Sequence, residues 1–226
     1  MLGHVENGAV EAVGSAYGAF SDVVRGVGDE QSWTPSGCTG WAVRDPVFHC
    51  LADAQRGLVA LHSPAQGPVD RDAVTYWRDW QPDAVGAAHG RRWSRVGASM
   101  FLDFGQLREL YLETAAALVL AAGRADTGLR IGTQGRVLTV RDLLTTLAVE
   151  ATIHHLDLIV GLPDARRPSE AGLACVRATL DGLLGRAVPM DWDGEHYARA
   201  ATGRVPLTDP ERHRLGADAE RFPLFS

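Results

Sequence analysis

Apolar side chains recur every three or four residues in four separate stretches of this 226-residue chain. This spacing places the side chains on one face of an α-helix, so each stretch predicts a helix with one buried stripe. The predicted helices run from Val10 to Val27, from Val43 to just before Ser63, from about Gln106 to Ala122 and from Val140 to about Leu158. Four helices of this length, with connections on both sides, predict a mainly α fold, an antiparallel four-helix bundle.

The ends and connections of these helices carry further signals. Thr139 is expected to cap the last helix, and Asp142 places a carboxylate at the positive end of its dipole. Residues 130–138 predict a short extended excursion. Residues 70–80 predict a further helix, followed by an irregular connection, and the tryptophans of this region are expected to shape a substrate site.

A glycine at position 161 and a proline at position 163 are expected to end the last helix of the bundle. We interpret residues 1–163 as the bundle and residues 164–226 as a small C-terminal α(+β) extension packed on it. The extension holds one predicted helix, from about Ser169 to Leu184, and a loop-rich tail with short helical turns.

Composition and charge limit the function classes. All 22 basic residues are arginines, which excludes chemistry that depends on a lysine, such as Schiff-base formation. The formal net charge is −6 and the arginines are scattered, which argues against a nucleic acid as the main partner. Cys38, Cys50 and Cys175 form no CxxC pair, so neither a disulfide framework nor a cysteine zinc site is predicted.

The sequence shows no targeting signal. The N-terminus lacks the basic region of a signal peptide, and no run approaches the ~20 apolar residues of a membrane span. We therefore expect a soluble, cytoplasmic protein that does not act at a membrane. The oligomeric state is left open.

One constellation could carry chemistry. Glu150 and His154 are four residues apart on one predicted helix, so their side chains emerge from the same face. A carboxylate and an imidazole at this spacing form a two-point chelate for a divalent metal. If the helix of His49 faces this one in the bundle, His49 completes a set of three ligands with one open position, which is typical of catalytic zinc.

Simpler interpretations remain open at this point. A Glu-x-x-x-His pair occurs often on helices, and His49 alone is typical of a hydrogen-bonded histidine at a helix edge. An ionised Glu150 buried in this largely apolar helix would require a cation or a proton. Exposure of Glu150 to solvent would satisfy it equally well.

Longer motifs surround these residues. The string C-x-G-W-x-V-R-D-x-x-x-H over residues 38–49 resembles the opening motif of the mycothiol-dependent maleylpyruvate isomerase family, a branch of the DinB-like metal-binding bundles. T-V-R-D at 139–142 and E-A-T-I-H-H-L-D-L at 150–158 resemble the second motif of that family. The tail is similar to that of many members over residues 202–208, 214–216 and 222–224.

This resemblance implies a DinB-like four-helix bundle with a zinc site. His49, Glu150 and His154 match the zinc ligands, with water or a thiolate in the fourth position. Asp157 and Asp45 are expected to support the ligands, because a metal-bound imidazole usually needs a hydrogen-bonding partner.

The resemblance also implies an activity: a zinc-dependent isomerase or S-transferase that uses mycothiol, the low-molecular-weight thiol of actinobacteria, as co-substrate. A metal-bound thiolate would attack an electrophilic small molecule; its expulsion gives isomerisation and its retention gives S-transfer. Arg204 and Arg44 are candidates for binding the substrate or the thiol, since guanidinium groups match carboxylates. No protein nucleophile is assigned, because the cysteines lack a catalytic pattern.

Two other function classes stay open. The chain could be a metal-dependent hydrolase that uses zinc-bound water, or a metal- or ligand-binding protein without catalysis. Another divalent metal could replace zinc, and the electrophile is not named by the sequence. Two departures from the family pattern, Ala42 in place of a Ser or Thr cap and Pro46 in the first turn, affect the start of the helix that carries His49.

Overall fold

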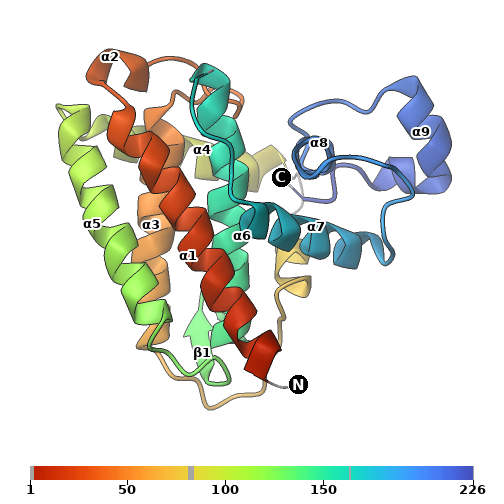
Figure 1. Cartoon of the computed structure of the whole chain (residues 1–226), viewed down its shortest axis with the longest axis horizontal. Helices are drawn as coiled ribbons and strands as arrows, with labels where there is room; N and C mark the ends of the chain where they lie inside the picture. The colour runs from red at the N-terminus through yellow and green to blue at the C-terminus, as the bar shows by residue number, and fades with distance from the viewer. Residues whose placement is uncertain (1–2, 81–83, 163, 226) are drawn as a thin grey trace.

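The computed structural model describes residues 3–80, 84–162 and 164–225. Within these residues four long helices pack side by side (Figure 1): α1 (Gly3–Gly26), α3 (Arg44–Leu61), α5 (Phe104–Ala122) and α6 (Val140–Leu158). The predicted mainly α, four-helix fold is confirmed. The apolar stripes predicted for the helices are buried. The side chains of the stripes that are at most 2% exposed include Val13, Phe20 and Val24 of α1 and Val47 and Leu51 of α3.

Short elements fill the connections: α2 (Asp29–Ser32), the 3-10 turn η1 (Thr75–Asp79), α4 (Ala84–Ser99), and an antiparallel hairpin of β1 (Arg130–Thr133) and β2 (Arg136–Thr139). The hairpin matches the extended excursion expected at 130–138. The prediction for residues 70–105 is wrong in its details, because residues 70–80 hold only η1 and the segment predicted as irregular contains α4. Gly90 and Gly97 favour non-helical conformations, and apolar residues are sparse among the arginines of α4, which is why the sequence did not indicate this helix.

The bundle has two helices in each direction. α3 ends beside the hairpin, where Pro64 forms a backbone bridge with Ile131, and α6 begins at this same end. α5 begins at the opposite end beside α2, where the Asp29 carboxylate accepts a hydrogen bond of 3.0 Å from the Phe104 N–H. α3 and α5 therefore run one way, α1 and α6 the other, and α3 faces α6 in antiparallel orientation.

α6 is the core helix of the bundle. By length and composition alone, the segment Val140–Gly161 is apolar enough to cross a membrane, yet 78% of its most apolar window is buried inside the molecule. The expectation that no run approaches a membrane span is corrected in this respect. The burial shows that the apolar side chains of this segment serve the protein interior.

The two helices that face each other begin with related contacts. Thr139 caps α6 as predicted, since its Oγ1 accepts a hydrogen bond of 3.1 Å from the Asp142 N–H. At the start of α3, Asp45 accepts a hydrogen bond of 2.8 Å from the Ala42 N–H. This contact supports the first turn of α3 although Ala42 provides no capping oxygen.

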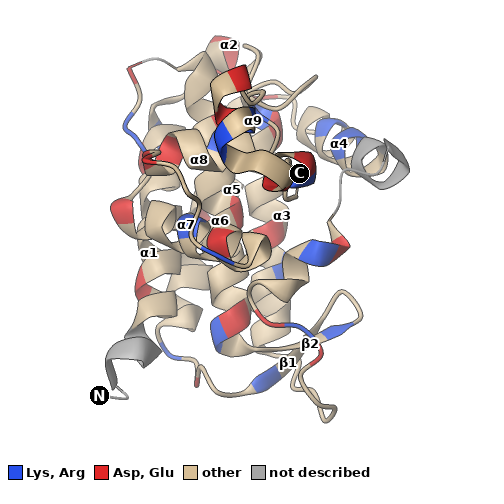
Figure 2. Cartoon of the chain, turned by 90° about the vertical axis from the view of Figure 1, so that its right-hand side faces the viewer, with Lys and Arg blue, Asp and Glu red and all other residues tan. Residues whose placement is uncertain are grey.

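The regular elements of the C-terminal extension are helical within its described residues, 164–225, and loops connect them. Its elements, which follow the turn η2 (Ile159–Gly161), are α7 (Glu170–Leu184), α8 (Gly194–Ala201), α9 (Asp209–Leu215) and the turn η3 (Gly216–Arg221). α7 packs on α6 and α1, while α8 and α9 lie beside the bundle (Figure 1). Figure 2 shows acidic and basic residues interspersed over these elements. The strands expected in the extension are absent from its described part, and the predicted boundary at residue 163 lies outside the described residues.

A close approach of α3 and α6 generates a stability prediction. At Gly57 of α3 an added Cβ would come within 2.8 Å of Cδ1 of Leu147, which is fully buried in α6. Truncation of this side chain leaves a cavity, so we expect Leu147→Ala to lower the free energy of unfolding by about 2–5 kcal/mol. Leu120→Ala, at an exposed position of α5, is the matched control and should change it by less than about 0.5 kcal/mol. Urea denaturation measures both; equal losses would contradict the assignment of Leu147 to the core.

Candidate metal centre

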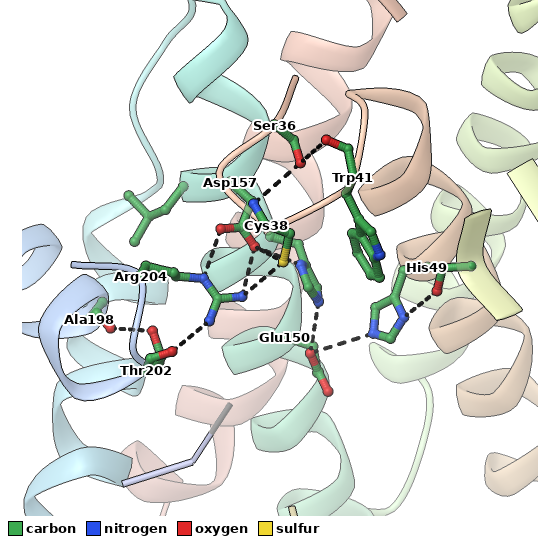
Figure 3. Close-up of polar contacts among 12 residues, drawn as sticks. Ser36, Cys38, Trp41, His49, Glu150, Asp157, Ala198, Thr202 and Arg204 are labelled. Carbon is green, nitrogen blue, oxygen red and sulfur yellow. Dashed lines mark hydrogen bonds and ion pairs between the residues drawn. The ribbon is translucent and has the colours of Figure 1, made fainter. Parts of the chain in front are cut away.

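The structure brings His49, Glu150 and His154 together between α3 and α6. Oε2 of Glu150 lies 3.7 Å from Nε2 of His49 and 3.4 Å from Nε2 of His154 (Figure 3). The three donor atoms all lie within 4.8 Å of one another. The i, i+4 spacing places two of them on one helix face, and the antiparallel packing of α3 on α6 supplies the third.

Trp41 packs against both imidazoles and forms an apolar wall beside them. Its ring stacks on that of His154 with 5.5 Å between centroids and 24° between planes, and lies 5.6 Å from the ring of His49. The ring centroids of the two imidazoles are 4.5 Å apart, with 67° between the ring planes. Because Trp41 is buried, it restricts the rotation of both rings and the access of water from its side.

The electrostatics of this cluster favour positive charge at its centre. Burial opposes ionisation of Glu150, but hydrogen bonds from His154 and His49 outweigh it and hold the pKa of Glu150 well below its ordinary value. Burial likewise opposes protonation of His154, yet its hydrogen bond to Asp157 and the nearby Cys38 and Glu150 raise the pKa of His154 well above its ordinary value. A proton or a metal ion can supply this positive charge.

Asp157 fixes the orientation of His154. Its carboxylate is fully buried and accepts a hydrogen bond of 2.9 Å from Nδ1 of His154, which leaves Nε2 facing Glu150. Arg204 donates two hydrogen bonds to the same carboxylate, at 2.8 and 2.7 Å. Burial alone would raise the pKa of Asp157, but Arg204 and His154 overcome it and keep the pKa below its ordinary value. Asp157 therefore contacts a candidate ligand, and its support of a metal-bound histidine stays a prediction.

Cys38 lies in this network, although sequence reasoning did not select it. Its thiol donates to Oδ2 of Asp157 at 3.3 Å and lies 3.7 Å from Nη2 of Arg204. The loop that carries Cys38 is fixed to α6, because the Gly37 N–H donates to the Asp157 carbonyl at 2.8 Å. The one signal in the sequence was that Cys38 opens the first motif.

Two other predicted residues lie in different surroundings. Arg44 donates to the Phe101 carbonyl at 3.0 Å and its guanidinium stacks over Trp33, 4.0 Å from the ring centroid. Asp45 bonds the Ala42 N–H at the start of α3, as described above. Both contacts stabilise the entry to α3, and neither brings these side chains to the three candidate ligands.

The residues present fit a divalent metal ion. Two imidazole nitrogens and one carboxylate oxygen form a donor set suited to zinc and to neighbouring transition metals. Glu150 is 21% exposed and His49 26% exposed, whereas His154 is almost buried, so one side of the cluster is accessible to solvent. Three protein donors with one side open to solvent are typical of a catalytic metal site. The fold and the site together describe a helical bundle with a candidate catalytic metal centre.

The comparisons place this bundle in a family. Residues 13–159 match the family model described as mycothiol maleylpyruvate isomerase N-terminal domain, so the chain belongs to that family. Two solved structures share the fold: the mycothiol-dependent maleylpyruvate isomerase, with 17% identity and a TM-score of 0.53, and a histidine-to-alanine mutant of it, with 18% and 0.54. Each match covers 76% of this chain and 68% of the other. No curated protein matches the chain.

The buried Asp157–Arg204 pair generates the second prediction. Asp157→Asn leaves a largely buried guanidinium without its counter-charge, so we expect the free energy of unfolding to fall by about 3–5 kcal/mol. Asp218→Asn, which breaks exposed ion pairs with Arg186 and Arg221, is the control and should cost at most about 1 kcal/mol. Urea denaturation of both variants measures these changes. A wild-type unfolding midpoint for Asp157→Asn would show that the ion pair does not stabilise the fold.

Proposed function

We propose that this chain is a metal-dependent isomerase or S-transferase that takes mycothiol as co-substrate and an electrophilic small molecule as substrate. His49, Glu150 and His154 would hold the metal, which we take to be Zn²⁺. The single observation that carries the proposal is the convergence of these three donor atoms, within 4.8 Å of one another, in a chain of this family.

The metal, when bound, would lower the pKa of a thiol at the open position and so provide a thiolate at neutral pH. The chain itself holds the ligands in place. Asp157 keeps Nδ1 of His154 occupied, Trp41 packs on both imidazoles, and Glu150 supplies the negative charge between them.

The reaction class follows from thiol chemistry. A thiolate that adds to an activated carbon–carbon double bond forms a C–S bond and converts the double bond into a single bond. Rotation about that bond and expulsion of the thiolate give the isomer, whereas protonation of the adduct gives a thioether. The guanidinium of Arg204 donates to Asp157, so we propose that Arg204 positions the carboxylate that orients His154.

The tryptophans of the region between α3 and α5 differ in their surroundings. Trp77 is buried against Phe225, with 4.3 Å between ring centroids, whereas Trp80 and Trp93 are about half-exposed. Trp93 packs on Phe48 of α3, one residue before His49. We propose that Trp93 helps to shape the substrate site.

We further propose that residues 1–163 form the catalytic bundle and residues 164–226 an extension that completes it. The ion pair between Arg204 of the extension and Asp157 of α6 supports the proposal that the extension completes the site. We also place the protein in a reducing cytoplasm, which suits a chain with free cysteines and a thiol co-substrate.

The metal proposal predicts the behaviour of two variants. We expect His49→Ala and Glu150→Ala each to lose a bound divalent metal during dialysis. Each variant retains two protein ligands, which bind the ion more weakly than three. His62→Ala, which removes an exposed imidazole at the end of α3, is the matched control and should retain the metal. Elemental analysis and circular dichroism of each variant provide the test. A wild-type protein that binds no divalent metal when supplied with one would overturn the proposal.

The co-substrate proposal predicts strict thiol dependence. With the metal-loaded protein and a panel of electrophiles, we expect turnover only when mycothiol is present, measured by loss of electrophile and of free thiol. Cys38→Ser should remain active, since the reacting sulfur comes from mycothiol. Turnover without thiol would favour hydrolysis by zinc-bound water instead. Thiol-independent turnover that is lost in a folded, metal-loaded Cys38→Ser would point to a protein nucleophile.

A further inference from the structure

A buried serine of α4 lies against the imidazole of His49. Ser94 is fully buried, although the residues on both sides of it, Trp93 and Arg95, are exposed. Its Oγ lies 3.4 Å from Nδ1 of His49. A buried hydroxyl needs a hydrogen-bonding partner, and this ring nitrogen provides one. The contact therefore joins α4 to the candidate metal centre.

The two ring nitrogens of His49 have different surroundings. Nε2 faces carboxylate oxygens of Glu150 and Asp53, at 3.7 and 3.4 Å, whereas Nδ1 faces the hydroxyl of Ser94. The carboxylates favour a proton or a metal ion at Nε2. A neutral imidazole carries its proton on one nitrogen and binds a metal through the other. When Nε2 binds the metal, the Nδ1–H therefore donates a hydrogen bond to the Ser94 hydroxyl.

His154 shows the same division between its ring nitrogens. Its Nδ1 lies 2.9 Å from Oδ2 of Asp157, and its Nε2 lies 3.4 Å from Oε2 of Glu150. Each candidate histidine ligand thus has one oxygen at Nδ1, from a carboxylate for His154 and from a neutral hydroxyl for His49. A partner at this nitrogen fixes the tautomer and the ring orientation of a metal-bound histidine.

Close packing of α4 on α3 sets the position of Ser94. At Gly97 an added Cβ would overlap the ring of Phe48, the residue before His49. The Trp93 ring packs on the same Phe48 ring, with 5.1 Å between centroids. Ser94 lies between these two contacts in the sequence, so they hold its hydroxyl beside the imidazole.

We propose that Ser94 is a positioning residue of the metal centre, which accepts a hydrogen bond from Nδ1 of His49 and so presents Nε2 to the metal. The proposal rests on the proposed metal centre and adds no ligand to it, since Ser94 contacts the nitrogen that does not bind the ion. The open position therefore stays free for the thiol. A neutral hydroxyl also orients His49 without reducing the positive charge that the proposed function requires.

The first test is nitrogen NMR of the histidine rings in the full-length, Zn²⁺-loaded protein. We expect His49 to carry its proton on Nδ1 and this proton to exchange slowly with water. In Ser94→Ala the same proton should exchange faster, because alanine offers no acceptor. The Nδ1 proton of His154 should be unaffected, because Asp157 is still present. A general loosening of the structure would change both rings.

The affinity for Zn²⁺ gives an independent measure that needs no assay of turnover. Zn²⁺ is titrated into the full-length apoprotein in competition with a chromophoric chelator. We expect Ser94→Ala to bind Zn²⁺ about 10-fold more weakly than wild type, at the lower end of losses for supporting residues. Ser99→Ala, which removes an exposed hydroxyl of the same helix, is the matched control and should equal wild type.

The outcomes separate Ser94 from the metal centre. Alanine is small and favours a helix, so Ser94→Ala is expected to fold, which circular dichroism checks. Unchanged proton exchange and unchanged affinity in the folded variant would overturn the role of Ser94. The wild-type spectrum decides independently of any variant, because a His49 proton on Nε2 in the Zn²⁺-loaded protein would overturn it too. Absence of Zn²⁺ binding in the wild type would instead overturn the metal centre itself.

Discussion

The buried ion pair between Asp157 and Arg204 connects the parts of the chain that form the site. Asp157 is on the core helix α6 and Arg204 is in the C-terminal extension, so their two hydrogen bonds hold the extension against the bundle. The Gly37 loop packs on the same position, where an added Cβ would lie 3.0 Å from the Asp157 Cα. The same Asp157 carboxylate also orients the imidazole of His154. The packing of the extension on the bundle and the orientation of His154 therefore both depend on the buried charge of Asp157.

Features that depend on neighbours in sequence could be predicted. The stripes of the long helices, the Thr139 cap and the shared face of Glu150 and His154 all follow from helical spacing. α4 could not be predicted in this way, because glycines interrupt it and much of its surface is exposed. The contact of Arg204 with Asp157 was also inaccessible, since it depends on how the extension folds back over 47 residues.

The two carboxylates that flank His49 in sequence show the limit of spacing arguments. Asp45 and Asp53 lie four residues before and four residues after it, and periodicity treats them alike. Asp45, however, is in the first turn of α3, where free backbone N–H groups compete for its oxygens, and it bonds Ala42. Asp53 is in the helix interior, where those groups are already bonded, so its carboxylate pairs with Arg56 instead.

The position of Cys38 bears on the source of the reacting sulfur. Its thiol bonds Oδ2 of Asp157, the oxygen that also accepts from Nδ1 of His154 (Figure 3). Cys38 therefore lies on the Nδ1 side of the imidazole, whereas Glu150 and His49 lie on the Nε2 side. A cysteine so placed supports the carboxylate that orients the histidine, and this position agrees with the proposal that the reacting sulfur comes from a bound thiol.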